Sequence, residues 1–111
     1  MINKDILNFA ADWWLQEIKR SKKNKSLSRN SITTFKEKFV KVVEQEFKCS
    51  DIINISTSRG VCDDIIYVIA SKCFGWDKVN LIPIGISMRI TYTGVYLLDS
   101  NKNIFNTLFE V

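Results

Sequence analysis

The spacing of the hydrophobic residues changes along this chain, and that change constrains its fold more than any other feature. In the first half these residues recur every three to four positions, as on one face of an amphipathic helix. From Ile84 to Ile90 every second residue is apolar, as in a strand with one buried face. Helices followed by short strands predict an α+β fold. The length of 111 residues is that of a single domain, which we expect to span residues 1–111.

Two amphipathic helices are predicted in the first half of the chain. Residues 3–20 begin with Asn3, a good N-cap, and carry a wide apolar face. Residues 21–30 are nearly all polar and carry no helical stripe, which predicts a loop. A second helix is expected from about Ser31 to Lys48, starting either at Ser31 or at the capping box that begins with Thr34. Its apolar stripe comprises Phe35, Phe39, Val42, Val43 and Phe47.

The remainder of the chain is predicted to form short strands and one further helix. Alternating apolar residues predict strands over residues 51–58 and 84–91, with a returning strand over 95–98 after a tight turn. A helix is predicted from residue 63 or 64 to Gly75, where the glycine ends it. Residues 104–109 form either an edge strand or an irregular segment. The order α-α-β-α-β-β, with or without a last β, predicts a small antiparallel sheet packed against helices.

The chain contains no histidine, which removes most common catalytic chemistry. Ser-His and Cys-His nucleophile pairs and His-bearing metal sites are excluded. Cys49, Cys62 and Cys73 form no CxxC pair, so we expect reduced side chains in or beside the core. Residues 56–60 precede a predicted helix but lack the spacing of known phosphate loops, which favours a structural role. We therefore expect a protein that is not an enzyme and has no cofactor or metal.

A cluster of cations without any acid lies in residues 19–29, between the first two predicted helices. The cluster comprises Lys19, Arg20, Lys22, Lys23, Lys25 and Arg29. The formal net charge of the whole chain is only +4, so the basicity is local. Cations attract acidic surfaces and phosphates, and we expect this basic loop to contact a partner. A protein partner is favoured over nucleic acid because the segment has no aromatic residue to stack on a base.

The adjacent pair Trp13-Trp14 is the second candidate contact. Neighbouring residues lie about 100° apart on a helix, so both rings are buried only if the apolar face is wide. Trp13 fits the core stripe, and Trp14 lies towards its margin. Core packing of both rings is one interpretation, and a partly exposed Trp14 that anchors a protein partner is the other. A homodimer through this pair or through an exposed sheet edge also stays open.

The sequence resembles a group of small proteins carried by phages, plasmids and conjugative elements of Gram-positive bacteria. The resemblance runs along the whole chain, and its distinctive part is the tryptophan pair. The corresponding positions are Ala11-Asp12-Trp13-Trp14, Phe35, Phe39, Ile53 to Ser56, Ala70, Pro83, Met88, Val95 and Leu108-Phe109-Glu110. The chain departs from the group after the first strand, where Ser56-Thr57-Ser58 replaces Asp-Tyr, and at Ser100-Asn101-Lys102, which replaces a Gly-Tyr-Gly turn.

The resemblance implies a mobile-element setting, which includes anti-CRISPR proteins. We expect a non-enzymatic protein that binds and inhibits a host protein, most concretely an anti-CRISPR protein that blocks a CRISPR effector nuclease. The alternative is a small nucleic-acid-binding accessory protein that uses the basic loop 19–29. Cytoplasmic localisation without membrane contact is expected, because no segment has the pattern of a signal peptide or the length of a membrane span.

Neutralising the basic loop tests its role in binding. We expect the triple substitution Lys22→Gln, Lys23→Gln and Lys25→Gln to slow association with the protein partner and to flatten the salt dependence of the rate, because rim charges act mainly on association. The association rate at low and at physiological salt measures this. Rates unchanged by the triple substitution would remove the loop from the interface.

Overall fold

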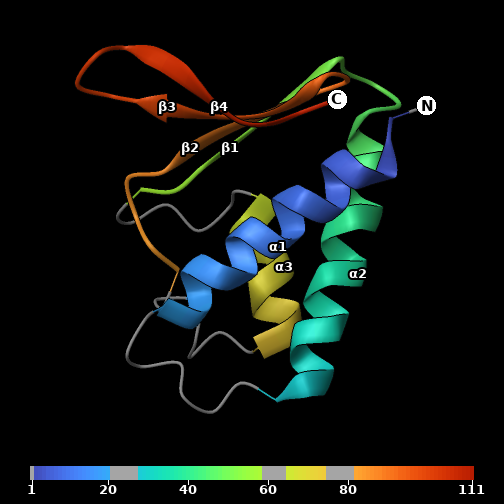
Figure 1. The fold of residues 1–111 in the computed structure, drawn as a ribbon. Helices are drawn as coiled ribbons and strands as arrows, with labels where there is room; N and C mark the ends of the chain where they lie inside the picture. The colour runs from blue at the N-terminus through green and yellow to red at the C-terminus, as the bar shows by residue number, and fades with distance from the viewer. Residues whose placement is uncertain (1, 21–27, 59–64, 75–81) are drawn as a thin grey trace.

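The computed structural model describes residues 2–20, 28–58, 65–74 and 82–111. This part of the chain contains three helices and a four-stranded antiparallel sheet. The first strand lies between the second and third helices in sequence, and the other three strands follow. The predicted α+β class is confirmed. Figure 1 shows the sheet as one layer and the helices as a second layer on one of its faces. The elements are α1 (Lys4–Arg20), α2 (Arg29–Glu46), β1 (Ile52–Ser56), α3 (Ile65–Phe74), β2 (Ser87–Thr91), β3 (Gly94–Asp99) and β4 (Ile104–Glu110).

Side-chain caps fix where the first two helices begin. Asn3 Oδ1 accepts a hydrogen bond of 2.8 Å from the backbone N–H of Asp5, which confirms the predicted cap of α1. Ser28 caps α2, because its backbone is extended and its Oγ accepts from the N–H of Ser31 at 3.1 Å. Both predicted starts of this helix were wrong by two residues or more. Arg29 therefore belongs to the first turn of α2 and not to a loop.

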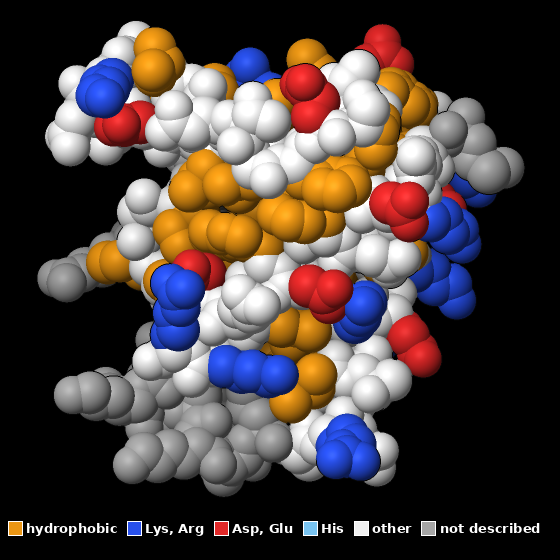
Figure 2. All heavy atoms as spheres, in the orientation of Figure 1, with side chains coloured by type: hydrophobic (Ala, Val, Ile, Leu, Met, Phe, Trp, Pro, Cys, Tyr) orange, Lys and Arg blue, Asp and Glu red, His pale blue; other side chains and the backbone are white. Residues whose placement is uncertain are grey.

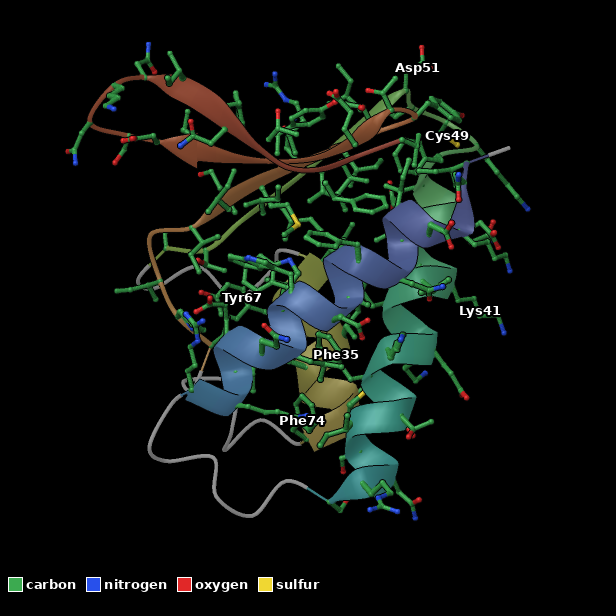
Figure 3. The ribbon with its side chains drawn as sticks, viewed as in Figure 1. Phe35, Lys41, Cys49, Asp51, Tyr67 and Phe74 are labelled. Atoms are coloured by element: carbon green, nitrogen blue, oxygen red, sulfur yellow. The ribbon has the colours of Figure 1, made fainter. Side chains whose placement is uncertain are left out.

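The three helices pack so that neighbours run in opposite directions. Lys4 near the start of α1 pairs with Glu44 near the end of α2, at 3.8 Å. Phe74, the last residue of α3, stacks on Phe35 in α2 with ring centroids 5.6 Å apart (Figure 3). The last turn of α3 thus lies beside the first turns of α2, and the last turn of α1 lies to their left, in the half of the helical layer away from the sheet (Figure 1).

The sheet follows the order β1-β2-β3-β4, and its inner face is apolar. Ile53 pairs with Ile90 and Ile55 with Met88, and all four side chains are buried. The strand predicted over residues 84–91 begins only at Ser87. The reason is Gly85, whose φ of +80° is incompatible with an extended strand.

The C-terminal segment forms β4, an edge strand, which is one of the two predicted alternatives. Val95 pairs with Phe109 while the next residue, Tyr96, pairs with Thr107, so Leu108 is the extra residue of a β-bulge. At this point Gly94 is required, because a Cβ there would collide with the carbonyl oxygen of Phe109. The backbones of β3 and β4 therefore approach closely beside the bulge.

The helices and the inner face of the sheet share one hydrophobic core. Its largest fully buried side chains are Trp14, Phe35 and Phe39, from α1 and α2. Most of the predicted apolar stripe of α2 is buried, whereas Val42 is only partly buried. The core is thus centred between α1, α2 and the sheet.

Phe39 tests this packing. We expect Phe39→Ala to lower the free energy of unfolding by about 3–5 kcal/mol, since a fully buried ring is replaced by a cavity. Chemical denaturation followed by circular dichroism measures the change, with the exposed neighbour Lys38→Ala as control. Equal stability of the two variants would contradict the core described above.

Candidate interaction surfaces

The structure reverses the predicted roles of the two adjacent tryptophans. Trp14 has no exposed surface, so the prediction that it is a partly exposed anchor was wrong. It belongs to the row Ile6, Ala10, Trp14 and Ile18, whose members are four residues apart and all buried. Trp13, about 100° further round the helix, is only partly buried. The sequence could not decide between the two rings, because either could lie at the centre of so wide an apolar face.

Trp13 belongs to an apolar surface that joins α1 to the C-terminal hairpin. We call the partly buried side chains Phe9, Trp13, Leu97 and Phe109 the α1–β4 patch. Phe9 and Trp13 are four residues apart on α1, so they lie on one side of the helix. Phe9 stacks on Phe109 of β4 with ring centroids 4.9 Å apart. Figure 2 shows a broad hydrophobic area between the sheet and the helices on this face of the molecule.

Charged side chains border this hydrophobic area. Asp12, next to Trp13 in sequence, is exposed and pairs with Lys36 of α2 at 3.0 Å. Figure 2 shows Lys, Arg, Asp and Glu side chains on several sides of the area. An apolar centre with a polar rim is the usual composition of a protein–protein interface.

A groove of about 560 Å³ lies between α1 and α2, on the other side of Asp12. Leu15, Ile32 and Val40 contribute apolar surface to it, and Lys19 is among the charged residues that line it. The Asp12–Lys36 ion pair joins the two helices at this groove. The described residues hold no group of three or more Cys, Asp or Glu side chains that could bind a metal ion. The groove thus offers mixed charges, with Lys19 and Lys36 beside Asp12 and Glu37.

The basic residues predicted from the sequence are only partly described. Lys22, Lys23 and Lys25 lie outside the described residues. Lys19 and Arg20 form the exposed last turn of α1, and Arg20 pairs with Glu17 at 3.2 Å. The antiparallel packing of α1 and α2 brings this turn to the same end of the helical layer as the exposed Arg29.

A further cation at this end was missed by the sequence analysis. Lys72 is exposed in the last turn of α3, and the Phe35–Phe74 stack holds that turn beside the start of α2. The only sequence signal is a lysine close to the end of a predicted helix. That the last turn of α3 lies beside α2 depends on helix packing between segments far apart in the chain.

The cysteines and the segment after β1 have structural environments. Cys49 is exposed, which contradicts the prediction that it lies in or beside the core, because it follows the last turn of α2 at the surface. Burial raises the pKa of the partly buried Cys73 thiol, and the charge of Lys38 opposes this less strongly. Thr57 is buried, and its Oγ1 accepts from the N–H of Ile86 at 3.1 Å. That hydroxyl therefore joins two segments of the fold, whereas Arg59 and Gly60 lie outside the described residues.

Comparisons with protein-family models, with curated proteins and with solved structures found no match for this chain. Among the helices that the structure describes, none has the length and apolar character needed to cross a membrane. The α1–β4 patch and the cations at the helix ends are the candidate surfaces that the geometry of the described residues supports.

The two tryptophans are expected to differ in their contribution to stability. We predict that Trp14→Ala lowers the free energy of unfolding by about 3–5 kcal/mol, and Trp13→Ala by clearly less, because Trp13 is already partly in water. Urea denaturation followed by far-UV circular dichroism avoids a signal that depends on tryptophan fluorescence. A larger loss for Trp13→Ala would contradict the assignment of Trp14 to the core.

Proposed function

We propose that this protein is a non-enzymatic binding protein that docks on a partner protein through the α1–β4 patch. The observation that carries the proposal is the set of three partly exposed aromatic rings, of which Phe9 and Trp13 share one side of α1 and Phe9 stacks on Phe109, with the partly exposed Leu97 on the neighbouring strand. Contiguous apolar surface of this kind on a small domain marks an interaction site. Tryptophan is also the residue type most enriched among side chains that dominate binding energy.

The neighbours of the patch hold its rings in place before a partner binds. Trp13 meets the buried Trp14 edge to face, with ring centroids 5.1 Å apart and an interplanar angle of 88°. Phe9 is held by its stack on Phe109. Side chains that are already ordered lose little conformational entropy on association, and this supports their use as anchors.

The position of the patch also allows the basic residues at the end of α1 to contribute to the same interface. Trp13 and Arg20 lie on the same helix, about 10 Å apart along its axis at a rise of about 1.5 Å per residue. A standard interface covers about 800 Å² on each partner, which is wide enough to include both. The apolar patch would then supply the desolvated contact, and the cations would steer association with an acidic or nucleic-acid-facing surface.

The sequence resemblance implies a protein of phages and other mobile elements, and this suggests what the binding does in the host cell. There the protein would bind and inhibit a host protein in the cytoplasm, most concretely as an anti-CRISPR protein that blocks a CRISPR effector nuclease. The patch and the cations beside it support binding to a protein that handles nucleic acid. Inhibition would follow if the bound protein covered the guide-binding or target-binding surface.

A pull-down from bacterial lysate, with and without nuclease treatment, tests the proposal. We expect a near-stoichiometric protein that survives nuclease and is lost with the double variant Phe9→Ala/Trp13→Ala. Ile52→Ala is the matched control, because Ile52 is also apolar and 46% exposed but lies on β1, at the opposite edge of the sheet. Recovery of nucleic acid alone, or equal capture by the double variant and wild type, would overturn the proposal.

A further inference from the structure

The helix ends that point away from the sheet carry cations from three separate parts of the sequence. We call Lys19, Arg20, Arg29 and Lys72 the helix-end cations, and all four are exposed. They come from the last turn of α1, the first turn of α2 and the last turn of α3. Figure 1 shows the start of α2 and the end of α3 side by side at the bottom of the helical layer, and the end of α1 in the same half of the layer, to their left. The end is therefore basic because of how the helices pack.

Among the described residues, Glu37 lines the same groove as Lys19, and the other nearby carboxylates are already paired. Arg20 forms an ion pair with Glu17, and Asp12 forms one with Lys36. Within the described ranges, Lys19, Arg29 and Lys72 make no ion pair, and the first turn of α2 contains no acidic residue.

Arg29 occupies a position that works against the stability of its own helix. The first turn of a helix carries partial positive charge and normally favours Asp or Glu. A cation in that turn is a local conflict of the kind that proteins retain at functional sites. An external anion would relieve it.

We propose that the helix-end cations bind the phosphate backbone of duplex nucleic acid, through side chains that do not belong to the α1–β4 patch. The attraction is the electrostatic, sequence-independent kind, in which protein cations displace counterions from phosphates. Of the large exposed hydrophobic residues in the described structure, Ile52, Ile84, Tyr92, Ile104 and Val111 lie outside the helices, and Val68 lies on α3 one turn before Lys72.

The scarcity of large exposed hydrophobic side chains among the described residues of the helices favours one partner class. A protein partner would require an apolar centre, and among the described residues of the helices Val68, at 39%, is the one large exposed hydrophobic residue. A single strand would require an exposed ring for its bases, whereas Phe74 at this end is partly buried against Phe35. A duplex presents phosphates, and binding to them requires neither an apolar centre nor an exposed ring. The inference does not rest on the proposed protein-binding function.

The experiment is a salt titration with a fluorescein-labelled DNA duplex of about 20 base pairs, followed by fluorescence anisotropy between about 50 and 200 mM NaCl. Each phosphate contact contributes about −0.9 to the slope of log K against log salt concentration. The triple variant Lys19→Gln/Arg29→Gln/Lys72→Gln should therefore reduce the magnitude of the slope by between about two and three. We expect its affinity at about 0.1 M salt to fall by more than tenfold.

The matched control is Lys41→Gln/Lys48→Gln/Lys102→Gln, which lowers the net charge by the same three units. These lysines are exposed on the later part of α2, just after it, and in the β3–β4 turn, away from the helix ends (Lys41 is labelled in Figure 3). We expect the control to retain most of the slope of the wild type. Circular dichroism confirms that both variants are folded, since only exposed side chains are changed.

Three results would overturn the proposal. The first is that the wild type does not bind the duplex at about 50 mM salt. The second is that the two triple variants lose equal amounts of duplex affinity. The third is that the wild type binds a single strand more tightly than the duplex. The double variant Phe9→Ala/Trp13→Ala should bind the duplex as the wild type does. If this double variant loses the protein partner and still binds the duplex, the two proposed binding activities depend on different side chains. Failure of one proposal can therefore be told from failure of the other.

Discussion

The burial of one row of side chains on α1 is the constraint on which the rest of the structure depends. Ile6, Ala10, Trp14 and Ile18 are all inside the core, so the rotation of the helix about its axis is fixed. Trp14 is the largest fully buried side chain, and truncating it would leave the largest cavity. Once this row faces inward, Phe9 and Trp13 must lie on the neighbouring strip of the helix surface. The position of the α1–β4 patch is thus a consequence of core packing.

The same helix connects the two surfaces that we assign to partners. Its middle turns carry the aromatic side chains of the patch, and its last turn carries Lys19 and Arg20. Apolar contact and charge act at different stages of association, because charge accelerates encounter over long distances while buried apolar contact slows dissociation. A molecule with both on one rigid helix can use the basic end for approach and the patch for retention.

Sequence periodicity predicted most of the elements because it depends on neighbouring residues. The alternation from Ile53 to Ile55 and from Met88 to Ile90 identified strands that the structure contains. It extended the second of these too far, since Gly85 adopts a positive φ that no alternation of apolar residues reveals. The start of α2 was missed for a similar reason. Several hydroxyl residues could cap it, and only the backbone conformation of Ser28 shows which one does.

The sequence by itself determined the α+β class, the helical and extended segments, the lack of histidine chemistry and the local concentration of cations. These properties follow from composition and from spacing within single elements. Tertiary structure decided which tryptophan is buried, which aromatic rings stay at the surface and that Lys72 joins Lys19 and Arg29. Each of these depends on the rotation and pairing of elements distant in the chain. That arrangement is set by the packing of the whole core, which no local pattern encodes.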